Sequence, residues 1–559
     1  MVRYVLPSLG LTLLLAACTG SGKGPHDSVP DSQADSHADS HTNTDDTGTP
    51  QFDPTADCDA LGFPSLAFVD AEASPLLYAT AADLTLHTTE GDWNLKQSWS
   101  GCDAYLFIPE EPAQNYGAPD PTWSKKKDNK ALIDTMPLNT QVFFLSSQAG
   151  AENRQAALDA LKVSVDDQLD TYDAETRAWK ERHIHYVTDK DSRADSWLGE
   201  TLTSPGWGAA IDRTQRVRYI GSMGDPERYD SGYGWFDPNI SLVANEARYY
   251  NYEAARQERL DSEDATVVQA FTGELISDPG WAGVTSTVDV ELPDAATMRT
   301  FDTLELDLTA LCEGDGEYGE CPAWDYINSA YLCDEGDPTV CTTELGRWIT
   351  TYHREGRWVH DVSPLLALLK NGGTRRISFY SQEPYDVSLT LRFSDRGDAD
   401  RPDEARVIYT GGGLSSTYND REPLAVDVPE DVTRVALAVV MSGHGQYGNP
   451  ACMEFCGTEH DFSVNGNDNL FTYAITDTTW GCMDQIEDGS VPNQYGTWWY
   501  GRDGWCPGKQ VNMNVVDVTD QVLFGQTNTI DYELTNLDGS LESGGDIDLV
   551  TWLVYYRAK

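Results

Sequence analysis

A glutamate between two nearby cysteines is the first residue of this chain whose setting suggests chemistry. The run Cys452-Met-Glu454-Phe-Cys456 places Glu454 midway between cysteines four residues apart. Turn or helical geometry brings such cysteines within disulfide range, whereas an extended segment does not. A disulfide there would present the Glu454 carboxylate on a small rigid loop. The alternative is a stapled surface loop with an incidental acid, and spacing alone does not separate the two.

An internal repeat supplies a second acid at a matching position. Residues 359–363 (Val-His-Asp-Val-Ser) are echoed by residues 515–519 (Val-Val-Asp-Val-Thr), and each run is followed by a turn and an alternating strand. Repeats of this kind indicate two copies of one structural unit. Upstream in each copy, a strand leads into a cysteine-containing loop that carries Asp325 in the first copy and Glu454 in the second. Two related β-sandwiches packed side by side would place both acids across one cleft.

The elements that position these loops divide the chain into an α/β half and an all-β half. Short apolar runs at 104–108 and 142–145 predict buried strands, and 152–169 predicts a helix. After residue 265 the pattern becomes short strands separated by turn residues. The expected segments are a signal peptide at 1–17, a disordered acidic tether at 18–51, an α/β domain at 52–224, a connector with a helix at 225–264, and two β-sandwich domains at 265–398 and 399–559.

The α/β segment resembles the thioredoxin-like fold, because a β-α-β unit is followed by a hairpin. Thioredoxin-like enzymes carry reactive cysteines directly after the strand that matches 105–108. Here that loop reads Pro109-Glu-Glu-Pro112 and contains no cysteine. Thiol exchange therefore lacks its reacting groups. We expect a structural or docking domain without redox activity.

The N-terminal residues predict export. Arg3 precedes a short apolar run at 9–15, and Leu15-Ala-Ala-Cys18 is typical of a bacterial lipoprotein signal. Cleavage before Cys18 would leave that cysteine to carry lipid; an ordinary secretory signal is the alternative. The polar stretch that follows is a disordered tether. We expect an exported lipoprotein at the outer membrane, on its periplasmic face or the cell surface, that touches the membrane only through its lipid.

Cysteine content agrees with an oxidising compartment. Eleven cysteines, less Cys18, leave an even ten. Sequence neighbours suggest the pairs Cys58–Cys102, Cys312–Cys321, Cys333–Cys341, Cys452–Cys456 and Cys482–Cys506. The C-x-x-C pairs typical of a zinc site do not occur in the sequence, so we expect no metal or cofactor. A net charge of −53 opposes binding to nucleic acid, and we expect a monomer.

Three motifs in the C-terminal half resemble the peptide-N-glycosidase F family. They are Cys-x-x-Trp-Asp at 321–325, Cys-x-Glu-aromatic-Cys at 452–456 and Arg-x-Gly-Trp-Cys-Pro-Gly at 502–508. The resemblance implies two jelly-roll domains and an amidase that releases N-linked glycans from asparagine. It also implies that the partner is an N-glycosylated protein or glycopeptide.

The resemblance assigns roles to particular residues. Asp325 matches the principal catalytic aspartate, Glu454 the glutamate that shares the site, and Arg502 an arginine of the cleft. The third acid of the family aligns with Gln382, with Glu383 beside it. That position is a departure from the family pattern. Tyr326, where the best-known member has an arginine, is another.

A pair of carboxylates suits amide hydrolysis, since one acid activates water while the other handles the departing nitrogen or the sugar. We expect Asp325 to activate the water and the amide, Glu454 to hold the sugar and the water, and Arg502 to polarise the carbonyl. Three aromatic residues are expected to stack on sugar faces, although aromatics are equally common in sandwich cores: Trp324, Tyr495 and Trp505.

Two other functions compete with the amidase. A non-catalytic lipoprotein that binds glycans in the same cleft is favoured by Gln382 and disfavoured by the retained Asp325 and Glu454. A copper monooxygenase has a similar two-sandwich architecture, but it needs several His and Met ligands. The relevant region offers four histidines without a His-x-His pair: His353, His360, His444 and His460.

Overall fold

The computed structural model describes residues 55–113, 117–277, 283–445, 453–537 and 545–559, apart from the side chain of Ser196. The signal sequence, the lipidation site Cys18, the tether and Cys452 lie outside these residues, so the expectations that concern them stay predictions. Residues from Asp53 to Lys559 form one compact unit. None of the helices in the described part of the chain combines the length and the apolar character needed to cross a membrane.

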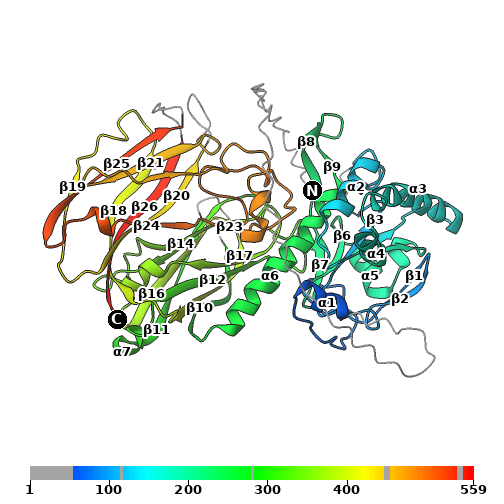
Figure 1. Ribbon diagram of the computed structural model, residues 1–559, viewed down its shortest axis with the longest axis horizontal. Coiled ribbons are helices and arrows are strands. Elements are labelled where there is room, and N and C mark those ends of the chain that lie inside the picture. Colours follow the sequence, from blue (N-terminus) through cyan, green and yellow to red (C-terminus); the bar gives the residue numbers. More distant parts are fainter. Residues whose placement is uncertain (1–54, 114–116, 278–282, 446–452, 538–544) are drawn as a thin grey trace, which may run out of the picture. The chain divides into compact units, whose positions relative to one another are not determined.

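An N-terminal mixed α/β sheet opens the described chain (Figure 1). Its order is β2-β1-β5-β4-β3-β6-β7; β3, β4 and β5 run parallel, while β6 and β7 are antiparallel. Every residue of β3 and β4 is buried, as expected of strands covered on both faces. Its strands are β1 (Thr85–Thr88), β2 (Gly91–Asn94), β3 (Ala104–Pro109), β4 (Thr140–Leu145), β5 (Ile184–Val187), β6 (Gly208–Ile211) and β7 (Val217–Ile220). A separate two-stranded sheet consists of β8 (Gly224–Asp230) and β9 (Trp235–Pro238).

Helices pack around this sheet. The helices are α1 (Ala56–Leu61), α2 (Lys126–Thr135), α3 (Ala151–Leu169), α4 (Ala174–Arg182), η1 (Asp191–Arg193), α5 (Ser196–Thr203), η2 (Ile240–Val243) and α6 (Ala244–Ser262). The expected connector contains α6, as predicted, and also the hairpin β8–β9, which the polar sequence there did not indicate. The finer assignment of this part as thioredoxin-like stays a prediction.

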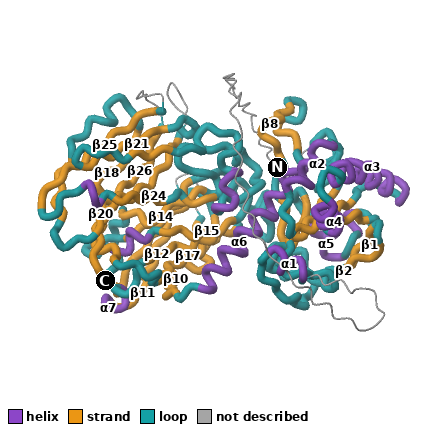
Figure 2. Tube along the Cα trace, in the orientation of Figure 1, coloured by secondary structure: helices purple, strands orange, loops and turns teal. Residues whose placement is uncertain are grey.

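Antiparallel sheets make up the rest of the chain (Figure 2). The first two are β10-β17-β12-β15 and β11-β16-β13-β14-β23, and the next two are β18-β26-β20-β24 and β19-β25-β21-β22. The strands are β10 (Ala265–Ile276), β11 (Val284–Asp294), β12 (Thr303–Leu311), β13 (Ile327–Leu332), β14 (Thr343–Ile349), β15 (Gly356–Asp361), β16 (Gly372–Ser381), β17 (Tyr385–Ser394), β18 (Asp400–Gly413), β19 (Leu424–Val428), β20 (Arg434–His444), β21 (Thr458–Val464), β22 (Leu470–Thr472), β23 (Lys509–Gln510), β24 (Met513–Asp517), β25 (Gln526–Asn536) and β26 (Asp546–Ala558). Short helices α7 (Ala295–Met298), η3 (Ser363–Leu368), η4 (Met483–Asp488) and η5 (Thr519–Gln521) connect them.

The repeat seen in the sequence is present in the strand order. Sheet β10-β17-β12-β15 corresponds strand for strand to β18-β26-β20-β24, and β11-β16-β13-β14 corresponds to β19-β25-β21-β22. Each echoed run forms a strand followed by a 3₁₀ turn, β15 and η3 in one copy and β24 and η5 in the other. The loop from β12 to β13 carries Asp325, and the equivalent loop from β20 to β21 carries Glu454. The two acids therefore occupy corresponding places in the two copies.

A segment of the second copy completes a sheet of the first. Strand β23 pairs with β14 through Ile349↔Lys509. The Val511 N–H donates to the Arg347 carbonyl at 2.8 Å, and the Trp358 indole donates to the Gly508 carbonyl at 2.9 Å. These bonds hold the end of the 502–508 run against the first copy.

Four disulfides occur among the described residues, and they join the cysteines that sequence proximity suggested. The pairs are Cys58–Cys102, Cys312–Cys321, Cys333–Cys341 and Cys482–Cys506. The expected pair Cys452–Cys456 involves Cys452, which lies outside the described residues.

Candidate active site

Arg502 brings the two candidate acids together. Its Nη2 lies 3.4 Å from Asp325 Oδ2, and its Nε lies 3.3 Å from Glu454 Oε1. The Arg502 side chain is 1% exposed, whereas the Asp325 and Glu454 side chains are 15% and 18% exposed. Carboxylates from two corresponding loops therefore meet on one buried guanidinium and keep an edge toward solvent.

The remaining donors of Arg502 are also engaged. Nη1 donates to the carbonyls of Thr497 and Tyr500 at 2.8 and 2.7 Å, and Nη2 also donates to the Tyr352 hydroxyl at 3.2 Å. All five guanidinium N–H groups thus have protein acceptors. The expected polarisation of a substrate carbonyl by Arg502 stays a prediction. In the structure Arg502 contacts both carboxylates and orients them.

Tyr352 is a site residue that no sequence pattern indicated. Its hydroxyl hydrogen-bonds the Asp325 carboxylate. Burial raises the pKa of Tyr352 well above its ordinary value, so the hydroxyl stays protonated. Burial also raises the pKa of Asp325, while the charge of Arg502 and the bond from Tyr352 oppose that rise. Asp325 is therefore an oriented carboxylate with increased basicity.

Glu383, the neighbour of Gln382, is a further carboxyl group close to Asp325. It lies in the turn between β16 and β17, and the backbone N–H of Trp324 donates to its carboxylate. Burial, with the charge of Asp325 adding to it, raises the pKa of Glu383 to about 7. Gln382 is half-buried beside it. Which of Gln382 and Glu383 takes the place of the family's third acid stays a prediction.

Asp503 anchors the loop that carries Glu454. The Asp503 N–H donates to the Glu454 carbonyl at 2.9 Å, and the Gly443 N–H donates to the Asp503 carbonyl at 2.9 Å. The buried Asp503 carboxyl accepts from the Thr458 N–H at 3.2 Å and from the Thr476 hydroxyl at 3.3 Å. Arg502 and Glu454 are therefore positioned by the same short stretch of backbone.

The three aromatic candidates have different surroundings. Trp324 is 51% exposed and precedes Asp325 in the chain. Tyr495 is half-buried and packs on Tyr318, with 4.7 Å between ring centroids. Trp505 is buried; its indole donates to the Gly443 carbonyl at 2.7 Å and its ring lies 5.3 Å from the Arg502 guanidinium. The expected stacking of Trp505 on a sugar stays a prediction, and in the structure this buried ring lies against Arg502.

Arg354 connects the site to the N-terminal half. Its Nη1 donates to Glu246 Oε1 at 2.9 Å and to the Pro492 carbonyl at 2.7 Å. Its Nη2 donates to the Tyr219 carbonyl at 3.0 Å, and its Nε to Glu317 Oε2 at 3.1 Å. One buried side chain, two residues from Tyr352, thus joins β7, α6 and two loops of the β-sheets.

Asn493 makes a second connection between the same parts. Its side-chain amide donates to Glu246 Oε1 at 3.0 Å and to the Leu242 carbonyl at 3.1 Å. The next residue, Gln494, accepts the backbone N–H of Tyr352 at 2.9 Å. The N-terminal half is therefore a structural support of the Tyr352 loop.

One cluster in the described residues has the composition of a metal site. It consists of Cys312, Cys321 and Glu355, all buried. The two cysteines form a disulfide with each other, so their sulfurs are not available as thiolate ligands. The cluster does not fit a metal ion.

Comparison with known proteins finds a partial family match. Residues 415–554 match the family model described as peptide-N-glycosidase F, C terminal. The chain is 25% identical over 242 residues to the peptide-N(4)-(N-acetyl-beta-D-glucosaminyl)asparagine amidase F of Elizabethkingia miricola, a match of 38% of this chain and 63% of that protein. The match thus spans less than two thirds of the length of that relative.

Two solved structures show a distant likeness to this chain. A peptide-N(4)-(N-acetyl-beta-D-glucosaminyl)asparagine amidase has a TM-score of 0.44 at 17% identity, over 53% of this chain and 97% of that one. PNGF-II has a TM-score of 0.39 at 14% identity, over 55% and 68%. Residues 415–554 are thus similar to the C-terminal domain of peptide-N-glycosidase F, and the chain resembles that amidase distantly over part of its length.

Proposed function

We propose that this protein is an amidase that hydrolyses the amide C–N bond of glycosylated asparagine side chains in N-glycosylated proteins or glycopeptides. The observation that carries the proposal is the convergence of Asp325 and Glu454 on Arg502 from corresponding loops. The similarity to peptide-N-glycosidase F supports it. Glu383 beside Asp325 adds the third carboxyl group.

The three carboxyl groups fit three parts of the reaction. Asp325, with its raised pKa and its orientation by Tyr352 and Arg502, takes a proton from water as the oxygen attacks the amide carbon. Glu383, with a pKa of about 7, is partly protonated at neutral pH and gives a proton to the departing nitrogen. The C–N bond then breaks to leave aspartate and a glycosylamine. Glu454 holds the first sugar and the water.

A protein that binds glycans without cleaving them is the second candidate. The amide of Gln382 at the position of the third acid favours it, because an amide neither gives up nor takes up a proton in this pH range. Glu383 opposes it, since a carboxyl group lies at the next position and reaches the Asp325 loop.

Release of intact glycans from a denatured N-glycosylated protein tests the proposal. We expect mass spectrometry to find the free glycan, and aspartate at each former glycosylation site, with a chelator present throughout. Binding of a glycopeptide by the wild-type protein without any release between pH 5 and 9 would support the binding protein instead.

The pH dependence of the rate assigns the proton donor. Glu383 donates only while protonated, so the wild-type rate should fall as the pH rises through about 7. Glu383→Gln should lower kcat and remove this alkaline limb, because the amide does not titrate. The matched control, Gln382→Ala, should keep the limb. An unchanged alkaline limb in Glu383→Gln would assign the proton to another group.

A further inference from the structure

A cavity with a volume of about 640 Å³ lies apart from Arg502 and the three acids. Its walls are the hairpin β6–β7, helix α6 and the outward face of the sheet β10-β17-β12-β15. A volume of this size falls in the range of about 300–1,000 Å³ that is usual for small-molecule sites. None of Asp325, Glu383, Glu454 and Arg502 lines it.

Two arginines of the cavity are paired with carboxylates that also line it. Arg357 makes two hydrogen bonds to the Asp307 carboxylate, at 2.9 and 2.7 Å. Arg218 Nη1 lies 3.0 Å from Asp212 and 2.7 Å from Glu253. A phosphate or sulfate would have to break these pairs to gain a guanidinium partner. These paired charges therefore favour an uncharged ligand.

Three further arginines of the cavity donate to neutral acceptors. Arg256 Nη1 donates to the Arg357 carbonyl at 2.6 Å. Arg213 Nη1 donates to Asn251 Oδ1 at 3.3 Å. Arg216 Nη1 donates to the Tyr78 carbonyl at 3.3 Å and to the Thr80 hydroxyl at 2.9 Å. An anion therefore remains the competing ligand for the experiment to examine.

The sheet wall presents groups that both donate and accept hydrogen bonds. They are Gln269 and Thr272 of β10, Thr309 of β12, and Ser388 and Thr390 of β17. Hydroxyl and amide side chains match the mixed donors and acceptors of sugar hydroxyls. The strands present them because these positions alternate with core residues such as Leu308 and Leu389.

Three buried polar atoms at the wall lack a hydrogen-bond partner among the described residues: the Tyr249 hydroxyl, Arg256 Nε and Glu355 Oε2. The Tyr249 hydroxyl belongs to a residue that is 3% exposed, and Glu355 Oε2 to one that is 7% exposed. Glu355 Oε1 already accepts the Cys312 N–H at 2.8 Å. Buried polar atoms are nearly always hydrogen-bonded. A hydroxylated ligand in the cavity is suited to supply these bonds after a small adjustment of the wall.

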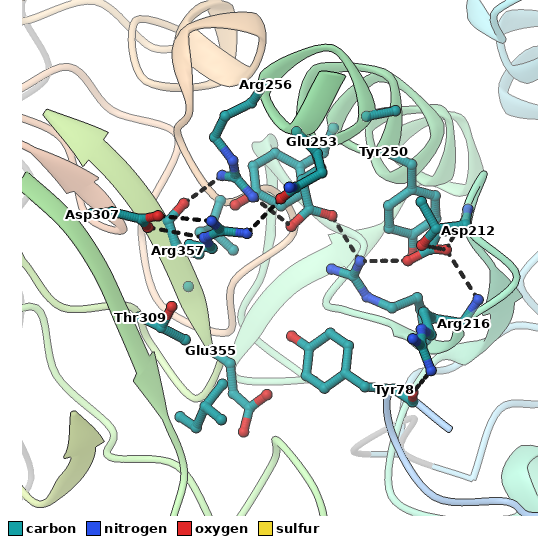
Figure 3. Close-up of a pocket in the computed structure, with 18 of the residues that line it drawn as sticks. Tyr78, Asp212, Arg216, Tyr250, Glu253, Arg256, Asp307, Thr309, Glu355 and Arg357 are labelled. Atoms are coloured by element: carbon teal, nitrogen blue, oxygen red, sulfur yellow. Dashed lines mark hydrogen bonds and ion pairs between the residues drawn. The ribbon is translucent and has the colours of Figure 1, made fainter. Parts of the chain in front are cut away.

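Tyr78 stands opposite the sheet wall in an unusual backbone conformation. Its φ of 61° lies in the left-handed region, which a tyrosine rarely adopts. Its ring lies 4.9 Å from the Arg218 guanidinium, and Figure 3 shows its hydroxyl end turned toward Thr309 and Glu355. Strained residues of this kind concentrate at ligand sites.

We propose that this cavity binds a neutral oligosaccharide, at a site separate from the amidase centre. An uncharged polyhydroxylated molecule matches three features of the cavity together: its arginine–carboxylate pairs, its row of hydroxyl and amide groups, and its tyrosines. The proposal goes beyond the amidase and does not depend on it, because a site with these groups binds sugar whether or not the protein cleaves glycopeptides.

Calorimetric titration of the full chain with N-acetylchitotriose and with mannotriose tests the site. At least one sugar should bind wild type, and Thr309→Trp should weaken that binding by about tenfold or more, because the indole occupies ligand space. Thr287→Trp makes the same change at an exposed position of β11, outside this cavity, and should bind like wild type. Tyr249→Phe, which removes only the hydroxyl, should weaken binding by about 2–10-fold.

Three results would overturn the proposal. The first is no saturable binding of either sugar by wild type, with or without binding of inorganic phosphate. The second is equal affinity of Thr309→Trp and Thr287→Trp. The third is loss of binding in Asp325→Asn with Thr309→Trp unaffected, which would place the sugar at the amidase centre.

Discussion

Asp325→Asn is expected to lower kcat/KM for glycan release by about 10²–10⁴-fold, the usual contribution of a positioned proton acceptor. The amide has the size of the carboxylate, and its oxygen can still accept from Arg502 and Tyr352, so the site should keep its shape. It cannot take up the proton of the attacking water. Chromatography of a labelled glycopeptide and its deglycosylated product measures the rate.

Asp289→Asn is the matched control for this change. Asp289 is an exposed aspartate of β11 that pairs with an exposed arginine, Arg376. The same loss of charge at this exposed strand position should leave kcat/KM unchanged. Glu454→Gln should reduce release heavily by loosening the hold on the sugar and the water. More than a tenth of the wild-type rate in Asp325→Asn would remove Asp325 from the chemical step.

Arg354→Met is expected to reduce the free energy of unfolding by about 3–5 kcal/mol, the usual result of removing one partner from a buried ion pair. The Arg354 side chain is 3% exposed. Its loss would leave the buried carboxylates of Glu246 and Glu317 without their ion-pair partner. The Pro492 and Tyr219 carbonyls would lose a donor as well. Denaturant titration followed by tryptophan fluorescence measures the change.

Arg376→Met separates this effect from the general loss of an arginine. The pair of Arg376 with Asp289 is solvent-exposed on both sides, and exposed pairs contribute little to stability. This variant should therefore unfold like wild type. Equal unfolding free energies for Arg354→Met and Arg376→Met would show that Arg354 does not hold the N-terminal half to the Tyr352 loop.

Local pattern was sufficient for much of the fold. Apolar runs of strand length predicted β3 and β4, because strands buried on both faces carry few polar residues. The echo of 359–363 in 515–519 predicted two matching units, and their corresponding strand orders agree with it. The meeting of Asp325 and Glu454 followed from that symmetry. Cysteines near one another in the sequence suggested the four described disulfides.

Long-range contacts account for what the sequence did not reveal. Nothing in the run 502–508 distinguishes a cleft arginine from a buried one, so the full set of acceptors around Arg502 was not foreseeable. The burial of Trp505 against Arg502 was not foreseeable for the same reason. The Glu246–Arg354 pair joins residues 108 positions apart, and no periodicity marks such a pair. Tyr352 acquires its role only through the fold.

The pairing of β23 with β14 has a consequence for synthesis of the chain. A ribosome makes β14, at Thr343–Ile349, well before it makes Lys509–Gln510. During that interval the outer edge of β14 lacks its neighbour, and an unpaired strand edge is a template for pairing with other polypeptides. The sheet β11-β16-β13-β14-β23 is complete only when nearly all of the polypeptide has been translated. A ribosome stalled before residue 509 would therefore display an open β-edge, which makes the nascent polypeptide a substrate for chaperones that shield such edges.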